Sequence, residues 1–122
     1  MRRVLYKYFH RTGSSLLGEI ISAKDNFSYF FEPLHSLRSD FRWKNQVAPN
    51  TEYISEFVQS LLTCKERAVR RFSKDKFIAK KSKNVNCSAS SDVVIKSIRL
   101  GWEHVMELSN RMPDLKIIHL VR

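Results

Sequence analysis

The sequence has no long apolar run and only two cysteines. No stretch of 18 or more apolar residues occurs, and Met1-Arg2-Arg3 leads directly into a segment of strand length. Neither a membrane span nor a secretory signal is therefore expected. Cys64 and Cys87 do not have metal-ligand spacing and the four His are scattered, which argues against a zinc site. A disulfide and two buried free thiols both remain open for the cysteine pair.

Acidic residues are scarce, with 12 Asp and Glu against 22 Lys and Arg, and the net charge is +10. Much of the excess lies in residues 65–83, where Glu66 and Asp75 are the acidic residues. The cations of this basic segment are Lys65, Arg67, Arg70, Arg71, Lys74, Lys76, Lys80, Lys81 and Lys83. Such a run attracts nucleic acid, heparin-like glycans and anionic lipids alike, and it also suits a solvated basic helix or loop. Charge alone does not choose among these.

The rest of the composition, 43% hydrophobic and 28% charged, is that of a folded soluble chain. Its 122 residues suit one domain, although they are few for a doubly wound α/β enzyme.

Residues 4–19 have the pattern of a strand, a Gly/Ser turn and the start of a helix. Backbone N–H groups at a helix N-terminus attract phosphate or sulfate, and Arg11 adds a fixed charge. Gly13 and Gly18 have the spacing of a triphosphate-binding loop. Glu19 and Ile20, however, stand where that motif needs Lys and Ser/Thr. A phosphate ligand bound without metal fits better, and an ordinary Gly/Ser turn is the alternative.

The chain alternates between strand and helix patterns. Strands are predicted from Val4 to Phe9, over 27–31, over 93–98 and over 115–121, the last of them buried on both faces. Helices are predicted over about 14–24, after Pro49, and over about 101–111. Residues 34–49 are expected to form a surface loop. Trp102, Val105, Met106 and Ser109 are expected on the inner face of the last helix. This order predicts an α/β fold of three layers with a parallel sheet.

Glu32 is the first candidate catalytic residue. It comes directly after the strand over 27–31, and Pro33 ends that strand. The carboxyl ends of parallel strands lie at one edge of the sheet, where ligands bind. Glu32 and the loop over 10–19 are therefore expected at the same edge. There Glu32 could act as a general base, or it could only pair with a nearby Arg or cap the turn before Pro33.

Three motifs, in order, resemble the carbohydrate sulfotransferases. Arg11-Thr-Gly-Ser-Ser-Leu-Leu-Gly-Glu19 is similar to their 5′-phosphosulfate-binding loop, whose pattern is close to Arg-Ser-Gly-Ser-Ser-Phe-x-Gly-Glu. Phe30-Phe31-Glu32-Pro33-Leu34 resembles their Phe-Glu-Pro-Leu segment. Asp114 to Arg122 resembles the strand that delivers the Arg of the 3′-phosphate site. The resemblance is strongest at 10–34 and 92–122 and weak in 36–90.

The resemblance implies a P-loop-like fold and sulfuryl transfer from 3′-phosphoadenosine 5′-phosphosulfate to a glycan hydroxyl, with no metal. Arg11 and Glu32 would be the catalytic residues, Glu32 as general base. The residues that would bind the co-substrate are Arg11, Thr12, Gly13, Ser14, Ser15, Leu16, Leu17 and Arg122. Similar family segments have Lys and Arg near Lys96 and Arg99, whose roles stay open.

The resemblance also implies a Golgi location, a glycan as partner and no nucleic-acid partner. Family members are usually anchored by an N-terminal helix, which this chain does not contain. A lumenal chain would permit the disulfide and would give meaning to the glycosylation patterns at Asn26 and Asn86.

The Asp-Pro-Arg and Ser that follow this strand in the family are absent after Arg122. We therefore expect residues 1–122 to be a partial sulfotransferase domain, with the 3′-phosphate motif starting at 115–122. Expressed alone, it should bind donor weakly, show no measurable activity and associate with itself. The alternative function is a basic module that binds glycosaminoglycan or nucleic acid through 65–83 without catalysis.

Overall fold

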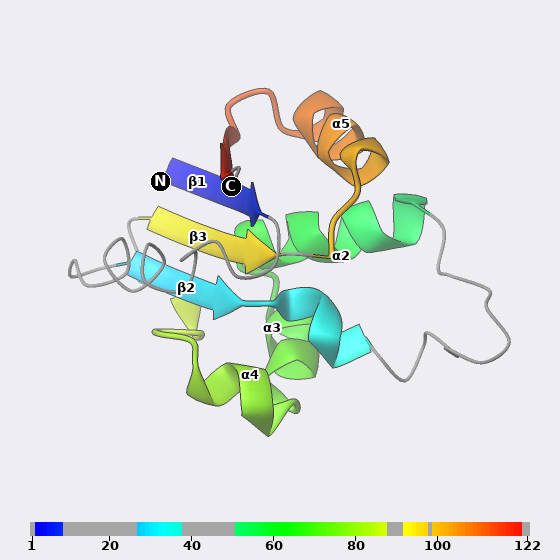
Figure 1. The fold of residues 1–122 in the computed structure, drawn as a ribbon. Helices are drawn as coiled ribbons and strands as arrows, with labels where there is room; N and C mark the ends of the chain where they lie inside the picture. Colours follow the sequence, from blue (N-terminus) through cyan, green and yellow to red (C-terminus); the bar gives the residue numbers. More distant parts are fainter. Residues whose placement is uncertain (1, 9–26, 38–50, 88–91, 98, 121–122) are drawn as a thin grey trace, which may run out of the picture.

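A parallel sheet of four strands organises the chain (Figure 1). The structure is a computed structural model that describes residues 2–8, 27–37, 51–87, 92–97 and 99–120. The strands are β1 (Arg2–Tyr8), β2 (Phe27–Phe31), β3 (Asp92–Ser97) and β4 (Lys116–Leu120). Their order is β2-β3-β1-β4, and each neighbouring pair is parallel. The α/β class and the parallel sheet that the sequence predicts are confirmed.

The central strand β3 carries apolar side chains on both faces of the sheet. Val93 and Ile95 belong to the main core, whereas Val94 packs with Phe27 and Tyr29 in a second cluster. This arrangement explains the continuous apolar run, because a parallel strand with both faces covered has no solvent face to leave polar.

The helical elements follow the strands in chain order. They are the 3₁₀ helix η1 (Pro33–Leu37), α2 (Thr51–Leu62), α3 (Glu66–Ser73), α4 (Lys76–Lys80) and α5 (Trp102–Arg111). The steps from β2 to β3 and from β3 to β4 run in the same direction across the sheet. Right-handed crossovers therefore put α2 and α5 on one face, and these two helices do pack together. The helix expected over 14–24, and with it the third layer, lies outside the described residues.

Helix α2 forms where the sequence predicts it. Ile54, Val58, Leu61 and Leu62 are buried and recur at helical spacing, so one face of the helix packs on the sheet. None of the helices in the described part of the chain is long and apolar enough to cross a membrane.

The basic segment forms two short helices between α2 and β3. Three apolar side chains, Ala68, Phe72 and Ile78, bury its inner side, and the Phe72 ring meets Phe30 edge-on at 5.0 Å between centroids. Cys64 and Cys87 form a disulfide with their Cα atoms 5.7 Å apart. Of the two possibilities that the sequence leaves open, the bonded one is present, and it ties together the two ends of this segment.

The inner face of α5 differs from the prediction. Val105 is buried as expected, but Trp102, Met106 and Ser109 are exposed. The buried positions are instead His104, Val105 and Leu108. Large apolar side chains therefore do not mark the inner face of α5, and the buried His104 ring accepts a hydrogen bond from the N–H of Gly101 at the start of the helix.

Two further expectations need correction. The surface loop predicted from Leu34 begins instead with η1, in which Leu34 and Leu37 are buried in the main core. Strand β4 was expected to be buried on both faces. It has one neighbour among the described strands, β1, and Lys116 at its start is exposed while Ile117 is half-buried.

Candidate active site at the carboxyl edge of the sheet

Two adjacent strands bring described candidate residues to one edge of the sheet, and a third strand ends at the same edge. Glu32 follows the last residue of β2, and Lys96 lies at the end of β3 opposite Phe31. Strand β1 pairs with the other side of β3, and the chain leaves its carboxyl end toward residues 9–26. Along the chain β1 leads to β2, which lies beyond β3 on one side, and β3 leads to β4, which lies beyond β1 on the other side. The carboxyl ends of β1 and β3 therefore form a topological switch point. Ligands of open α/β sheets bind at such points.

Glu32 is buried, with 4% of its surface exposed, and its backbone has a φ of 47°. This left-handed conformation is rare for a residue with a side chain and costs roughly 1–2 kcal/mol. Two hydrogen bonds hold it. The N–H of Glu32 donates to the carbonyl of Lys96 at 2.9 Å, and its own carbonyl accepts from the N–H of His35 at 3.0 Å. The sharp turn directs the chain from β2 into η1.

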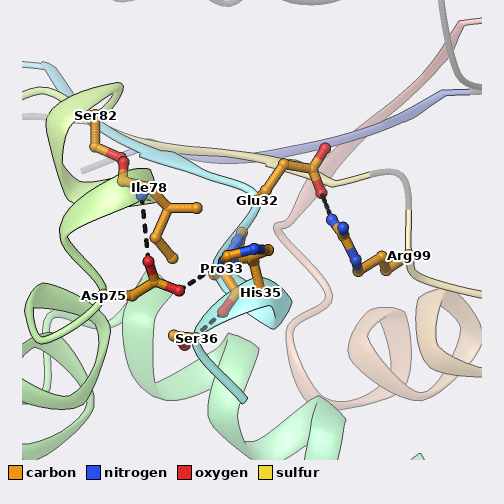
Figure 2. Close-up of polar contacts among 8 residues, drawn as sticks. All are labelled: Glu32, Pro33, His35, Ser36, Asp75, Ile78, Ser82 and Arg99. Carbon is orange, nitrogen blue, oxygen red and sulfur yellow. Dashed lines mark hydrogen bonds and ion pairs between the residues drawn. The ribbon is translucent and has the colours of Figure 1, made fainter. Parts of the chain in front are cut away.

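Two cations contact the Glu32 carboxylate. Arg99 donates from Nη1 to Oε2 at 3.0 Å, and the Nζ of Lys96 lies 3.4 Å from Oε1. Figure 2 shows the Arg99 side chain extending toward Glu32 from the segment that follows β3. Lys96 is almost fully buried and Arg99 is about one-third exposed. The expectation that Glu32 lies at this edge is confirmed, and so is the alternative that it pairs with an Arg.

Burial lowers the pKa of Lys96 from 10.5 to about 8, and repulsion from Arg99 adds to the shift. The neighbouring Glu32 carboxylate favours the charged ammonium, so the loss of hydration outweighs this attraction. The Lys96 Nζ also lies 4.1 Å from the centre of the Phe31 ring, whose face attracts a cation. A lysine with this pKa is a group that can exchange a proton near neutral pH.

A second polar contact joins η1 to α4. The Nδ1 of His35 lies 2.6 Å from Oδ2 of Asp75, which is buried. The other oxygen of Asp75 accepts from the N–H of Ile78 at 3.5 Å and so caps the N-terminus of α4. In Figure 2 Asp75 lies on one side of Pro33 and His35, and the Glu32–Arg99 contact lies on the other.

The structure brings together only part of the predicted site. Residues 11–17 and Arg122 lie outside the described residues, so the phosphosulfate loop and the 3′-phosphate position are not part of this geometry. Lys96 and Arg99, whose roles the sequence left open, contact the predicted base. The pairing of His35 with Asp75 was missed. The signal that was available was an isolated acid at a helix start inside a basic run.

No group of three His, Cys, Asp or Glu in the described ranges could hold a metal ion. Within those ranges the side chains at this edge are a carboxylate, an ammonium and a guanidinium. This set can take up a proton and can attract an anionic ligand.

No family model, curated protein or solved structure matches this chain.

Proposed function

We propose that this chain is the 5′-phosphosulfate-binding part of a carbohydrate sulfotransferase with a P-loop-like fold, acting in the Golgi lumen. It transfers the sulfuryl group of 3′-phosphoadenosine 5′-phosphosulfate to a hydroxyl of a glycan. The observation that carries the proposal is the position of Glu32. It lies at the carboxyl edge next to β3, and the Arg11 loop follows β1 on the other side of β3.

The donor is held through its two phosphate ends. Arg11 and the backbone of residues 12–17 bind the 5′-phosphosulfate and stabilise the charge that develops on the leaving phosphate. Arg122, at the end of the β4 segment, contributes to the 3′-phosphate site. Sulfuryl transfer at this site needs no metal, because fixed cations and backbone donors neutralise the charge that develops on the leaving phosphate.

Glu32 takes the proton in the transfer step. The acceptor oxygen attacks sulfur, the bond from sulfur to the 5′-phosphate oxygen breaks, and the hydroxyl proton passes to the carboxylate. Lys96 and Arg99 orient that carboxylate, since each contacts a different one of its oxygens. The disulfide is consistent with an oxidising compartment such as the Golgi lumen.

Donor binding tests this proposal without requiring turnover. The probe is 3′-phosphoadenosine 5′-phosphate, titrated calorimetrically and compared with adenosine 5′-phosphate. We expect a clear preference for the 3′-phosphorylated nucleotide. We also expect a loss of about 1.5–3 kcal/mol in Arg11→Ala, the usual range for a hydrogen bond to a charged group.

The matched control is Arg67→Ala, which removes the same charge from an exposed position on α3. It should bind the nucleotide as the unchanged protein does. Equal binding of the two nucleotides, or a loss below about 0.5 kcal/mol in Arg11→Ala, would contradict the proposal.

A further inference from the structure

Helices α3 and α4 carry a dense cationic surface, which we call the α3–α4 surface. Its exposed residues are Lys65, Arg67, Arg70, Lys74, Lys76, Lys80 and Lys81. Arg67 and Arg70 of α3, and Lys74 directly after it, recur at helical spacing on the side opposite the buried residues Ala68 and Phe72. Such an alignment produces a positive potential along the length of the helix.

Few of these cations form ion pairs among the described residues. Glu66 is the exposed carboxylate of the segment, and it contacts Arg70 at 3.4 Å on the surface. Asp75 is buried and bonded to His35. Within the described residues, Lys65, Arg67, Lys74, Lys76 and Lys80 form no ion pair. The charge excess therefore remains available to an anionic partner.

The surface is held rigidly against the sheet. The disulfide joins the two ends of the segment, and Phe72 and Ile78 anchor it in the core. At its far end, Lys83 exchanges two backbone hydrogen bonds with Tyr29 of β2, and the Ser82 hydroxyl accepts from the N–H of Phe31. Cations on such a frame lose little freedom on binding, which favours affinity.

The same contacts place the surface beside the candidate active site. The Nζ of Lys81 lies 5.1 Å from the centre of the Phe31 ring, and Phe31 precedes Glu32. The pairing of His35 with Asp75 joins the turn after Glu32 to the start of α4. Figure 1 shows α3 and α4 next to β2, the strand that ends at the site.

We propose that the α3–α4 surface binds the acceptor, and that this acceptor is a polyanionic glycan carrying sulfate or carboxylate groups. This inference rests on the proposed function, and it adds the class of acceptor and where the acceptor is held. The glycan extends along the basic helices and presents one hydroxyl to Glu32.

Two observations favour a glycan over a nucleic acid. The disulfide fits an oxidising compartment, where acidic glycans are the abundant polyanions. Phe77 is the exposed aromatic of α3 and α4, and the Nζ of Lys81 lies 4.6 Å from the centre of its ring. Single-stranded nucleic acids are usually bound by several stacking aromatics.

The test measures the dissociation constant of a fluorescent heparin octasaccharide across about 0.05–0.4 M NaCl. The variant combines Arg67→Ala, Arg70→Ala and Lys74→Ala. We expect the dissociation constant to be at least about tenfold higher than in the unchanged protein. The slope of its logarithm against the logarithm of the NaCl concentration should be smaller by about two to three. A neutral dextran oligosaccharide should not bind.

The matched control combines Arg67→Lys, Arg70→Lys and Lys74→Arg, which keeps every charge, and it should bind heparin within about twofold of the unchanged protein. A second variant, Lys76→Ala with Lys80→Ala, tests the surface separately on α4. It should also weaken binding, whereas removing one exposed charge on β4 with Lys116→Ala should not.

Three results would overturn the proposal: no heparin binding, equal loss in the charge-keeping control, or tighter binding of an oligo-dT strand of similar charge. Donor-nucleotide affinity is measured on the same proteins and should not change. If the unchanged protein binds heparin but does not bind the donor nucleotide, the proposed enzyme function is rejected and the polyanion-binding surface stands. If it binds the donor nucleotide but does not bind heparin, only the proposed acceptor class is rejected.

Discussion

Glu32 combines an unfavourable backbone conformation with a buried charge. A glycine would adopt a φ of 47° without steric cost, yet the position carries a carboxylate that contacts Lys96 and Arg99. Strained residues persist where the surrounding structure fixes them, and they concentrate at functional sites. The three residues therefore form one unit, in which a change at any member alters the environment of the other two.

Replacing Glu32 by Gln tests the catalytic role. The amide keeps the shape of the side chain but cannot accept a proton, so in a homologous protein that contains the whole catalytic domain sulfate transfer should fall by about a hundredfold or more. Donor affinity should be unchanged, because the predicted contacts to the nucleotide come from other residues. A sulfate-transfer assay with radiolabelled donor measures the first quantity and calorimetry the second. Unchanged transfer by Glu32→Gln would leave Glu32 with a purely structural role.

The titration of Lys96 can be followed directly. In protein labelled with ¹³C at lysine Cε, one resonance should titrate with a midpoint of about 8, and Lys96→Met should remove it. Arg99→Ala should raise this midpoint because repulsion is lost. The midpoint should stay below 10.5, since burial is the larger cause of the shift.

Lys116→Met is the control for this titration, since Lys116 is exposed at the start of β4. It should leave the resonance with the low midpoint in place. A spectrum in which every lysine titrates above about 10 would contradict the burial argument.

At the scale of elements, α5 begins with an unusual cap. The N–H of Gly101 donates to Nδ1 of His104 at 2.9 Å, where many helices use Glu or Gln three residues after the cap. Accepting this bond requires Nδ1 to be unprotonated. Burial lowers the pKa of His104 below 6.5, and Glu103 opposes the shift. The start of α5 is thus sensitive to acid.

We expect the free energy of unfolding to decrease as the pH falls below about 6.5. The unfolded chain takes up the His104 proton more readily than the folded chain, so the contribution of His104 is complete above that pH and is lost below it. Urea unfolding at about pH 7.5 and about pH 5 measures the change.

His104→Gln keeps an acceptor without titrating, so its unfolding should be less sensitive to acid. His104→Ala should cost about 1 kcal/mol at the higher pH. Equal acid sensitivity of the unchanged protein and His104→Gln would rule this cap out as the cause.

Local patterns predicted some elements well and others poorly. β2 was placed correctly, because an aromatic run ends at Pro33, and α2 was placed correctly by its buried stripe. Helices α3 and α4 are short and have few buried side chains among many charges, and the sequence left helix and loop both open for this segment. In α5 the buried face carries His104, Val105 and Leu108, whereas the large apolar side chains of Trp102 and Met106 are exposed.

The candidate site shows the same division. Glu32 was predicted at the sheet edge, because a strand followed by proline is a local signal. Its contacts with Lys96 and Arg99 join residues that are more than 60 positions apart, and they depend on β2 lying beside β3. Strand order is a property of the whole sheet, so no local pattern predicts these partners.

At the scale of the whole molecule, the disulfide closes a loop that contains the entire basic segment. Replacing Cys64 and Cys87 together by Ser should lower the free energy of unfolding by about 3 kcal/mol, because the unfolded chain regains the entropy of a loop with 23-residue separation. Urea unfolding of the two proteins measures the difference. Adding a reductant should reproduce it in the unchanged protein and have no effect in the variant. A difference below about 1 kcal/mol would mean that packing on Phe72 and Ile78 alone holds the segment.

The strand order also determines when the molecule can fold during synthesis. Of the four described strands β1 is made first, but its neighbours in the sheet are β3 and β4. β2 also pairs with β3. No strand pair of this sheet can therefore form until residues 92–97 have left the ribosome, and until then the apolar segments of β1 and β2 remain unpaired. Exposed apolar segments of this kind make an incomplete chain prone to aggregation, so we expect the risk to end when β3 is available for pairing.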